Sequence, residues 1–497
     1  MANIKALAGQ TAIYGVSTIL GRLLNYLLLP LHTYMFEDPA QYGIVTLLYA
    51  WVSLFMVLLT YGMETAFFRY SQIDEYKDKT FSTIVVSLLI TSSLFILLTT
   101  GFSQHIAGWL QSSDNSRYVI RSEYVTWLGI IISIDAFTSI FFASLRRRMK
   151  AIKFAIVKMV NILTSIFFNL FFLLLCPYLL QQNIAVDFVN MVYNPEIGVG
   201  YIFIANLIAC IVTLLLLLPD LFKVKFVFDI KLWKIMFIYA FPLLILNLAG
   251  IVNETIDRVL LERFSPPDIA QAQVGIYGAC YKISIIITLF VQAFRYAAEP
   301  FFFSKAKEGD AKQTYSDVMS IFVLVCSFAF LVVMLYLDII QYFVSPKYRV
   351  GLSIVPILLL ANIFLGIFYN LSIWYKLTDK TKYGACISLI GATITLLLNM
   401  ILIPHIGYMG SAWATFICYL SMVIISYLLG KRHYHVDYKV LRITCYILFS
   451  VGIYFCSTLF FIENFTLRMV IHTLFLLAYP MGIFMIDRHY IKMILKR

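Results

Sequence analysis

Charged residues are scarce in this sequence. Only 13% of the 497 residues are Asp, Glu, Lys or Arg, whereas 61% are hydrophobic. Soluble globular domains carry about 25% charged residues, so this composition excludes an ordinary soluble protein. The apolar residues form blocks of roughly 20, which is the length of a membrane-spanning helix. The sequence therefore predicts an all-α, polytopic membrane protein.

Motifs of metal, redox and nucleotide chemistry are also missing. The eight cysteines include no CxxC pair and have no histidine at ligand spacing, so we expect buried hydrophobic thiols. There is no P-loop, HExxH or G-x-S-x-G motif, and no loop is long enough to hold a soluble domain. These absences disfavour an enzyme. We expect a transporter that needs no cofactor and acts within the membrane.

Hydropathy predicts fourteen spans. Their approximate ranges are 9–31, 42–66, 81–102, 119–145, 154–176, 197–219, 235–260, 273–295, 318–344, 352–375, 384–403, 410–429, 441–462 and 467–486. The excess of positive charge, +12 in all, lies on alternate loops. This bias indicates membrane topology rather than a nucleic-acid partner, and it predicts that both termini are cytoplasmic.

The chain shows signs of an internal duplication. The segment around Gly43 and Tyr49 aligns with the segment around Gly275 and Tyr281, about 232 positions later. Six spans separate equivalent points, and an even number gives parallel repeats related by an axis along the membrane normal. We therefore expect a six-helix lobe at 1–220, a second at 221–430, and two appended helices within 431–497.

Charged side chains inside the spans mark a candidate site, because each costs roughly 2.5 to 3.5 kcal/mol at the membrane centre. An excess of cationic side chains suits an anionic substrate, and Arg can hold phosphate oxygens with two hydrogen bonds. The cations concerned are Arg22, Arg258, Lys282 and Arg295.

Polar and acidic residues in the same spans form a second group of candidates, for a polar cavity or for ion coupling. They are Asn25, Asp135, Glu254 and Asp257. Two structural interpretations stay open. Glu254 could simply neutralise Arg258, four residues away, and amide or hydroxyl stripes are common contacts between membrane helices.

Several short motifs are spread along the chain. They are Gln41-Tyr42-Gly43, the segment Gly62 to Arg69, Asp257-Arg258, Val274-Gly275-Ile276-Tyr277, and Pro404-x-x-Gly407-x-x-Gly410-x-Ala412. With these motifs the chain resembles a known family, the polysaccharide transporters or Wzx-type oligosaccharide flippases. That family belongs to the multidrug/oligosaccharidyl-lipid/polysaccharide exporter superfamily.

The resemblance implies a flippase in the bacterial inner membrane that moves an undecaprenyl-pyrophosphate-linked oligosaccharide by alternating access, for O-antigen, lipopolysaccharide or capsule synthesis. It implies that the cationic residues bind the pyrophosphate, that membrane lipid surrounds the prenyl tail, and that a polysaccharide polymerase is a functional partner. Two alternatives stay open. One is a lipid II flippase, and the other is an exporter of a drug or metabolite coupled to Na⁺ or H⁺ through Asp135, Glu254 or Asp257.

Overall fold

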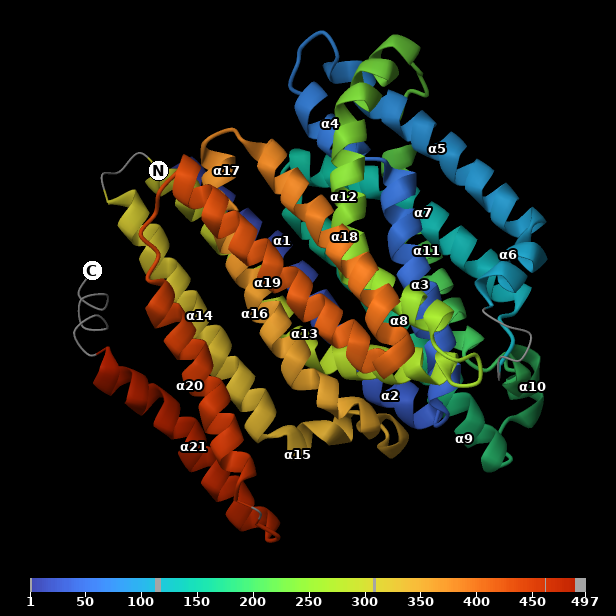
Figure 1. Ribbon diagram of the computed structural model, residues 1–497. Coiled ribbons are helices and arrows are strands. Elements are labelled where there is room, and N and C mark those ends of the chain that lie inside the picture. Colours follow the sequence, from blue (N-terminus) through green and yellow to red (C-terminus); the bar gives the residue numbers. More distant parts are fainter. Residues whose placement is uncertain (1, 112–117, 307–309, 461, 488–497) are drawn as a thin grey trace. The chain divides into compact units, whose positions relative to one another are not determined.

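The computed structural model describes residues 2–111, 118–306, 310–460 and 462–487. Every regular element within these ranges is a helix (Figure 1). A helix satisfies all backbone hydrogen bonds within one segment, as the hydrocarbon core of a membrane requires. The prediction of an all-α polytopic membrane protein is confirmed.

Thirteen helical segments of the described chain are long and apolar enough to cross a membrane. The remaining predicted span, 9–31, coincides with helices α1 and α2. The first half of the chain contains α1 (Ala2–Tyr26), α2 (Leu28–Met35), α3 (Pro39–Thr60), α4 (Met63–Tyr70), α5 (Lys77–Gly101), α6 (Ser103–Leu110), α7 (Ser122–Arg147), α8 (Ala151–Leu170), α9 (Cys176–Gln181), α10 (Val186–Val192) and α11 (Gly200–Leu221). The second half contains α12 (Ile230–Phe264), α13 (Ala270–Lys305), α14 (Ala311–Leu335), α15 (Leu337–Ile340), α16 (Val355–Leu371), α17 (Ile373–Leu377), α18 (Thr381–Ile406), α19 (Tyr408–His433), α20 (Val440–Thr458) and α21 (Phe465–Ile486).

The chain divides into two compact units. The first comprises Met1–Gly278 with Asn399–Gly407, and the second comprises Ala279–Leu398 with Tyr408–Arg497. Helix α13 begins in the first unit and continues into the second. The expected six-helix lobes, 1–220 and 221–430, stay a prediction.

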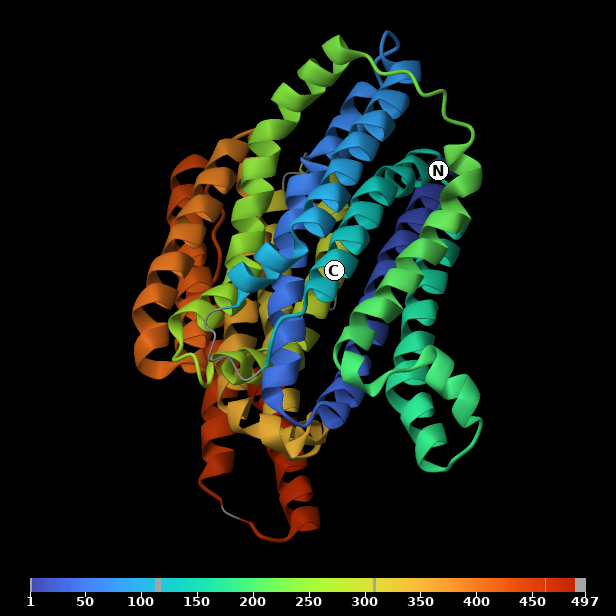
Figure 2. The ribbon, with the colours of Figure 1, turned by 90° about the vertical axis from the view of Figure 1, so that its right-hand side faces the viewer.

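In the first unit, α8 packs against both α1 and α11 (Figure 2). Helix α7 packs against α5, α11 and α3, and the other side of the unit is formed by α3 packed against α12. An aromatic core fills the space between α4, α5, α7 and α12, with Phe67, Phe141 and Tyr70 among its buried members. These contacts hold α3 and α12 in place within the first unit. Both helices carry residues of the candidate sites.

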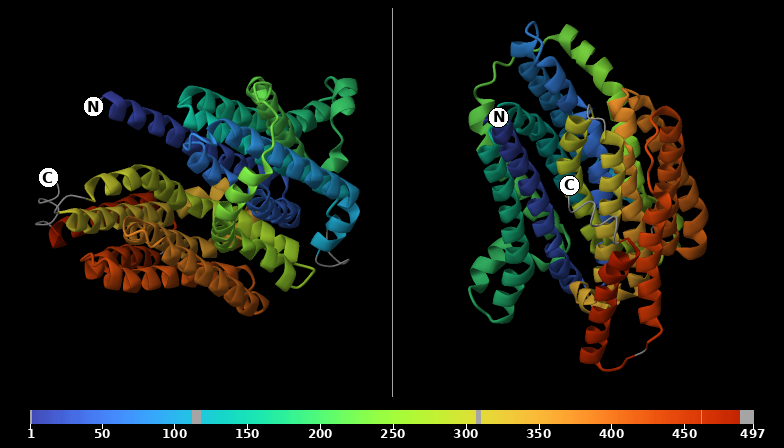
Figure 3. Two further views of the ribbon diagram at one scale, coloured as in Figure 1. Left: turned by 90° about the horizontal axis from the view of Figure 1, so that it is seen from above. Right: turned by 90° about the vertical axis from the view of Figure 1, so that its left-hand side faces the viewer.

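In the second unit, α16 packs against α19, and α14 packs against α20 and α21. Helices α20 and α21 form an antiparallel pair at the C-terminal end of the described chain (Figure 3). They lie within 431–497, and the expectation that this segment is appended to two six-helix lobes stays a prediction.

Several helices begin at a side-chain cap. The carboxylate of Asp38 accepts from the backbone N–H of Ala40 at 3.0 Å, with Pro39 in the first turn of α3. Asp229 caps α12 and accepts from the backbone N–H groups of Lys231 and Leu232 at 3.0 and 3.1 Å. The bond from Leu232 contributes most to holding the pKa of Asp229 below its usual range. This cap therefore stays ionised at neutral pH.

The eight cysteines are all free thiols. The expectation that all are buried is wrong for three, because Cys386, Cys445 and Cys456 lie on faces of α18 and α20 that no neighbouring helix covers. The buried ones are Cys176, Cys210, Cys280, Cys326 and Cys418.

The duplicated segments meet each other in the first unit. A Cβ added to Gly43 would lie 1.9 Å from the carbonyl oxygen of Gln271, and a Cβ added to Gly275 would lie 1.9 Å from the carbonyl oxygen of Pro39. At the offset of about 232 residues, Gly43 corresponds to Gly275 and Pro39 to Gln271. The two contacts are therefore reciprocal, as at a two-fold axis. This reciprocity supports the interpretation of parallel repeats.

We expect Gly43→Ala and Gly275→Ala each to lower the free energy of unfolding by about 1 to 3 kcal/mol. In both variants the added methyl group would collide with a backbone carbonyl oxygen, which cannot move aside as a flexible side chain could. The control is Gly250→Ala in the interior of α12, where no atom lies within 4 Å of the added Cβ. That variant should be neutral or slightly stabilising. Unfolding by SDS in mixed micelles measures all three, and equal stability of the three variants would contradict the close contact.

Candidate functional site

One group of polar residues in the first unit lies on α1 and α12. Tyr26 on α1 lies within electrostatic range of Arg22, one helical turn earlier, and of Glu254 and Arg258 on α12. We call these residues, together with Asp257, the Tyr26 cluster. This cluster contains four of the residues predicted from the sequence, on two helices more than 200 positions apart.

Arg258 in this cluster is held by a carboxylate. Its Nη1 lies 2.8 Å from Oδ1 of Asp257, and the side chains of Arg258 and Asp257 are only 11% and 3% exposed. The second oxygen of Asp257 accepts from the hydroxyl of Tyr277 on α13 at 2.5 Å. Asp257 is therefore a positioning residue for Arg258. Arg258 forms an ion pair with its neighbour Asp257, and the backbone carbonyl oxygen of Glu254 also accepts from the guanidinium.

Arg22 differs from Arg258 in its surroundings. The side chains of Arg22 and Asn25 are exposed on α1, and the side chain of Glu254 is exposed on α12. A guanidinium that is not enclosed by protein can approach an anionic ligand with its full fork of donors. In the Tyr26 cluster, Arg22 is thus the cation best placed to meet a ligand.

A second polar group in the first unit surrounds Asp135 on α7. The thiol of Cys210 on α11 donates to Oδ1 of Asp135 at 3.3 Å, and Lys158 on α8 lies within electrostatic range. The Nζ of Lys158 also lies 4.3 Å from the centre of the Phe142 ring. We call Asp135, Lys158 and Cys210 the Asp135 cluster.

Sequence reasoning missed Lys158. The basic residues after α7 were interpreted as a cytoplasmic loop that ends at Lys153, but Lys158 lies two turns inside α8. A lone cation at that depth needs a partner, and this was the signal that could have paired it with Asp135. The neighbouring amides have structural partners, since Asn161 donates to Thr213 at 2.8 Å and Asn206 donates to Tyr49 at 3.0 Å.

The other two predicted cations belong to the second unit. The guanidinium of Arg295 lies 3.9 Å from the centre of the Tyr369 ring, next to a small cavity of about 20 Å³ that Lys376 also lines. Lys282 is half-buried on α13. That Arg22, Arg258, Lys282 and Arg295 form one anion site stays a prediction.

Metal ligands are not grouped in the part of the chain that the structure describes. No set of three or more His, Cys, Asp or Glu side chains there could hold a metal ion. The chemistry available in the two polar clusters is electrostatic binding, hydrogen bonding and proton exchange.

Comparisons with known proteins agree with this architecture. The chain is similar to a lipid II flippase, MurJ, in an inward closed conformation, with 16% identity, a TM-score of 0.73, and coverage of 97% of this chain and 100% of the other. It is also similar to a multidrug resistance MATE family transporter in an inward-facing conformation, with 13% identity, a TM-score of 0.64, and coverage of 86% and 95%. At these identities the likeness shows the fold alone. No curated protein sequence matches the chain.

The family model described as "Polysaccharide biosynthesis protein" matches residues 7–305, which is more than half of the chain. This match covers α3, α7, α8 and α12, and with them both polar clusters of the first unit. The chain belongs to the family described as polysaccharide biosynthesis protein.

Proposed function

We propose that this protein is a flippase that moves undecaprenyl-pyrophosphate-linked oligosaccharide from the cytoplasmic to the periplasmic leaflet of the bacterial inner membrane. The translocated lipid would serve surface polysaccharide synthesis, including O-antigen or capsule, and would pass to a polymerase that acts on the same carrier. Family membership supports transport in polysaccharide synthesis, and the fold is one that a lipid II flippase also uses.

The observation that carries the proposal is that Arg22 and Arg258 both lie within electrostatic range of Tyr26. The pyrophosphate is the anionic group shared by all substrates of this class. Arg22 is exposed and supplies a bidentate donor, while Asp257 and Tyr277 hold Arg258 in place. In this proposal Lys282 and Arg295 complete the anion site, and Asn25 lies beside it on α1.

Alternating access is the proposed mechanism, with the lobes 1–220 and 221–430 rocking against each other and 431–497 appended. Both termini are proposed to be cytoplasmic. During this motion the cavity would close on one side of the membrane and open on the other. The pyrophosphate would keep its contacts with Arg22 and Arg258 throughout. Most of the hydrocarbon tail would stay in lipid, because the cost of moving the molecule lies in its charged and sugar groups.

Asp135, Glu254 and Asp257 are proposed to be the residues at which Na⁺ or H⁺ coupling would act. Asp135 is the best supported of these, because Cys210 and Lys158 surround it inside the helix bundle. Intramembrane carboxylates next to a cation are a common arrangement for proton exchange.

Deletion of the gene in its host tests the proposal. We expect the lipid-linked oligosaccharide to accumulate with its sugars on the cytoplasmic face, and we expect the wild-type protein but not Arg22→Ala to reverse the accumulation. Export of organic cations should be unchanged. Loss of cation export without any accumulation of lipid-linked glycan would favour the exporter of a drug or metabolite instead.

A further inference from the structure

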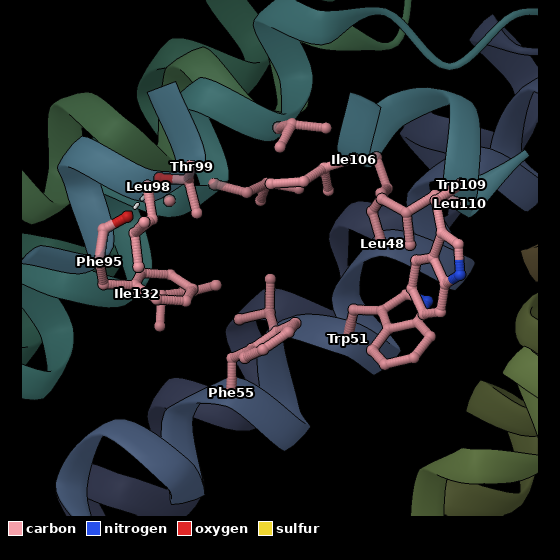
Figure 4. Close-up of a pocket in the computed structure, with 14 residues that line it drawn as sticks. Leu48, Trp51, Phe55, Phe95, Leu98, Thr99, Ile106, Trp109, Leu110 and Ile132 are labelled. Carbon is pink, nitrogen blue, oxygen red and sulfur yellow. Dashed lines mark hydrogen bonds between the residues drawn. The ribbon is translucent and has the colours of Figure 1, made fainter. Parts of the chain in front are cut away.

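A cavity of about 270 Å³ lies in the first unit, between α3, α5, α6 and α7 (Figure 4). Its volume is near the lower end of the range for small-molecule sites. Trp51 and Trp109 lie together at one end of it, and Phe95 and Leu98 lie at the other. None of the residues of the Tyr26 cluster or the Asp135 cluster lines this cavity.

The lining offers almost no polar partner to a ligand. Thr99 is its one residue with a hydroxyl group, and that hydroxyl donates to the backbone carbonyl oxygen of Phe95 at 2.8 Å. An ion, a sugar or a hydrogen-bonding drug would lose its water contacts here without replacement. A water molecule would also lack the two to four polar partners that it needs. The cavity therefore suits a purely hydrocarbon occupant.

The cavity opens toward the surface that faces the membrane. Leu98 and Trp109 line it and are 46% and 60% exposed. On the same helix as Leu98, Leu94 and Leu97 are 53% and 70% exposed. Since α5 is long and apolar enough to cross a membrane, this exposed apolar surface would face lipid, and an occupant would enter from the bilayer.

Aromatic rings form the wall along α3 and reach across to α5 and α6. The ring centres of Trp51 and Trp109 are 5.3 Å apart, those of Trp51 and Phe55 are 6.0 Å apart, and those of Phe55 and Phe95 are 5.4 Å apart. Hydrocarbon gains no hydrophobic energy by leaving lipid for protein, so binding must come from packing contacts. A chain with flat, methyl-branched and partly rigid units packs on such rings and loses less conformational entropy than a saturated acyl chain.

We propose that this cavity binds a segment of the polyisoprenoid chain of the lipid-linked substrate. The inference rests on the proposed function and adds a tail site to its head site. Helix α3 packs against α12, which carries Arg258, and also lines the cavity. The pyrophosphate and a segment of the tail would thus be held by neighbouring helices of one unit.

Photo-crosslinking tests the tail site in the full-length protein in lipid nanodiscs. The probe is a polyprenyl diphosphate with a diazirine on its chain, and a phosphatidylcholine with a diazirine on an acyl chain is the comparison. The filling variant is Leu98→Trp. Its matched control is Leu97→Trp, the same change on the next residue of α5, which does not line the cavity.

We expect the polyprenyl probe to label residues of the cavity in the wild type and in Leu97→Trp, and we expect this labelling to be lost in Leu98→Trp. Unlabelled polyprenyl diphosphate should compete, and excess phospholipid should not. Equal labelling of the cavity by the phosphatidylcholine probe would overturn the inference, as would polyprenyl labelling spread evenly over the lipid-facing helices.

The same preparations separate this inference from the proposed function. Specific labelling of the cavity without any translocation of lipid-linked oligosaccharide would support the tail site and contradict the flippase. Translocation by the wild type with no specific labelling of the cavity would contradict the tail site alone.

Discussion

Arg22→Ala should slow transport of the lipid-linked oligosaccharide by one to two orders of magnitude while leaving the fold intact. A charge-assisted hydrogen bond to the pyrophosphate is worth about 1.5 to 3 kcal/mol, and each 1.4 kcal/mol corresponds to about a factor of ten. The side chain is exposed on α1, so its removal leaves no buried partner behind. Initial transport rates in proteoliposomes, normalised to the amount of folded protein, measure the effect.

Arg22→Lys tests the geometry of the same contact. Lysine keeps the charge but loses the bidentate fork, so we expect a rate between those of Arg22→Ala and the wild type. The control is Arg148→Ala, which removes an exposed arginine just beyond the end of α7 and should transport normally. Full activity of a well-expressed Arg22→Ala, or equal rates for Arg22→Gln and Arg22→Lys, would rule out the anion site at Arg22.

Lys158→Met should destabilise the protein by about 2.5 to 3.5 kcal/mol, because it leaves the carboxylate of Asp135 without its cation inside the membrane. The control is Lys439→Met, just before α20. Lys439 forms an ion pair with Asp437 in which the two side chains are 40% and 73% exposed, and exposed pairs contribute about 0 to 1 kcal/mol. Unfolding by SDS in mixed micelles measures both variants.

The double variant Asp135→Asn with Lys158→Met decides whether the two charges stabilise each other. Removal of both charges should recover most of the stability lost in Lys158→Met, because the remaining amide and thioether need no counter-ion. If the two single losses simply added in the double variant, the residues would act independently, and the Asp135 cluster would not contain a coupled charge pair.

Much of the architecture could be predicted from the sequence because the membrane imposes it. Apolar runs of the right length specify helices, and the thirteen spans of the described chain follow from hydropathy and length alone. The offset between the repeats even points to the reciprocal contacts of Gly43 and Gly275. The sequence did not predict that α3 and α13 pack against each other at these two glycines.

The candidate site was only partly predictable from the sequence. Hydropathy indicates how deep in the membrane a residue lies, but it does not indicate which helices pack against each other. Arg22 and Arg258 were predicted as parts of one site; both lie within electrostatic range of Tyr26, and a shared anion site stays a prediction. The partner of Arg258 was not predicted. Neighbouring residues on a helix do not normally face each other, and Asp257 meets Arg258 in an arrangement where Tyr277 also holds the carboxylate.

The apolar cavity had no sequence signal at all. Trp51 and Trp109 are far apart in the chain and belong to α3 and α6, and aromatic residues are common in membrane helices. Their pairing depends on the short helix α6, which packs against α7 and α5. Such contacts depend on packing rather than on composition.

Translocation by the purified protein tests the central claim most directly. Proteoliposomes would contain undecaprenyl-pyrophosphate-linked oligosaccharide in both leaflets, and a membrane-impermeant glycosidase added outside would digest the exposed sugars. The account predicts that wild-type protein lets the enzyme digest nearly all of the glycan, whereas protein-free vesicles and vesicles with Arg22→Ala stay near half over the same period. Digestion that stops at half with folded wild-type protein, with or without a gradient of Na⁺ or H⁺, would contradict the account.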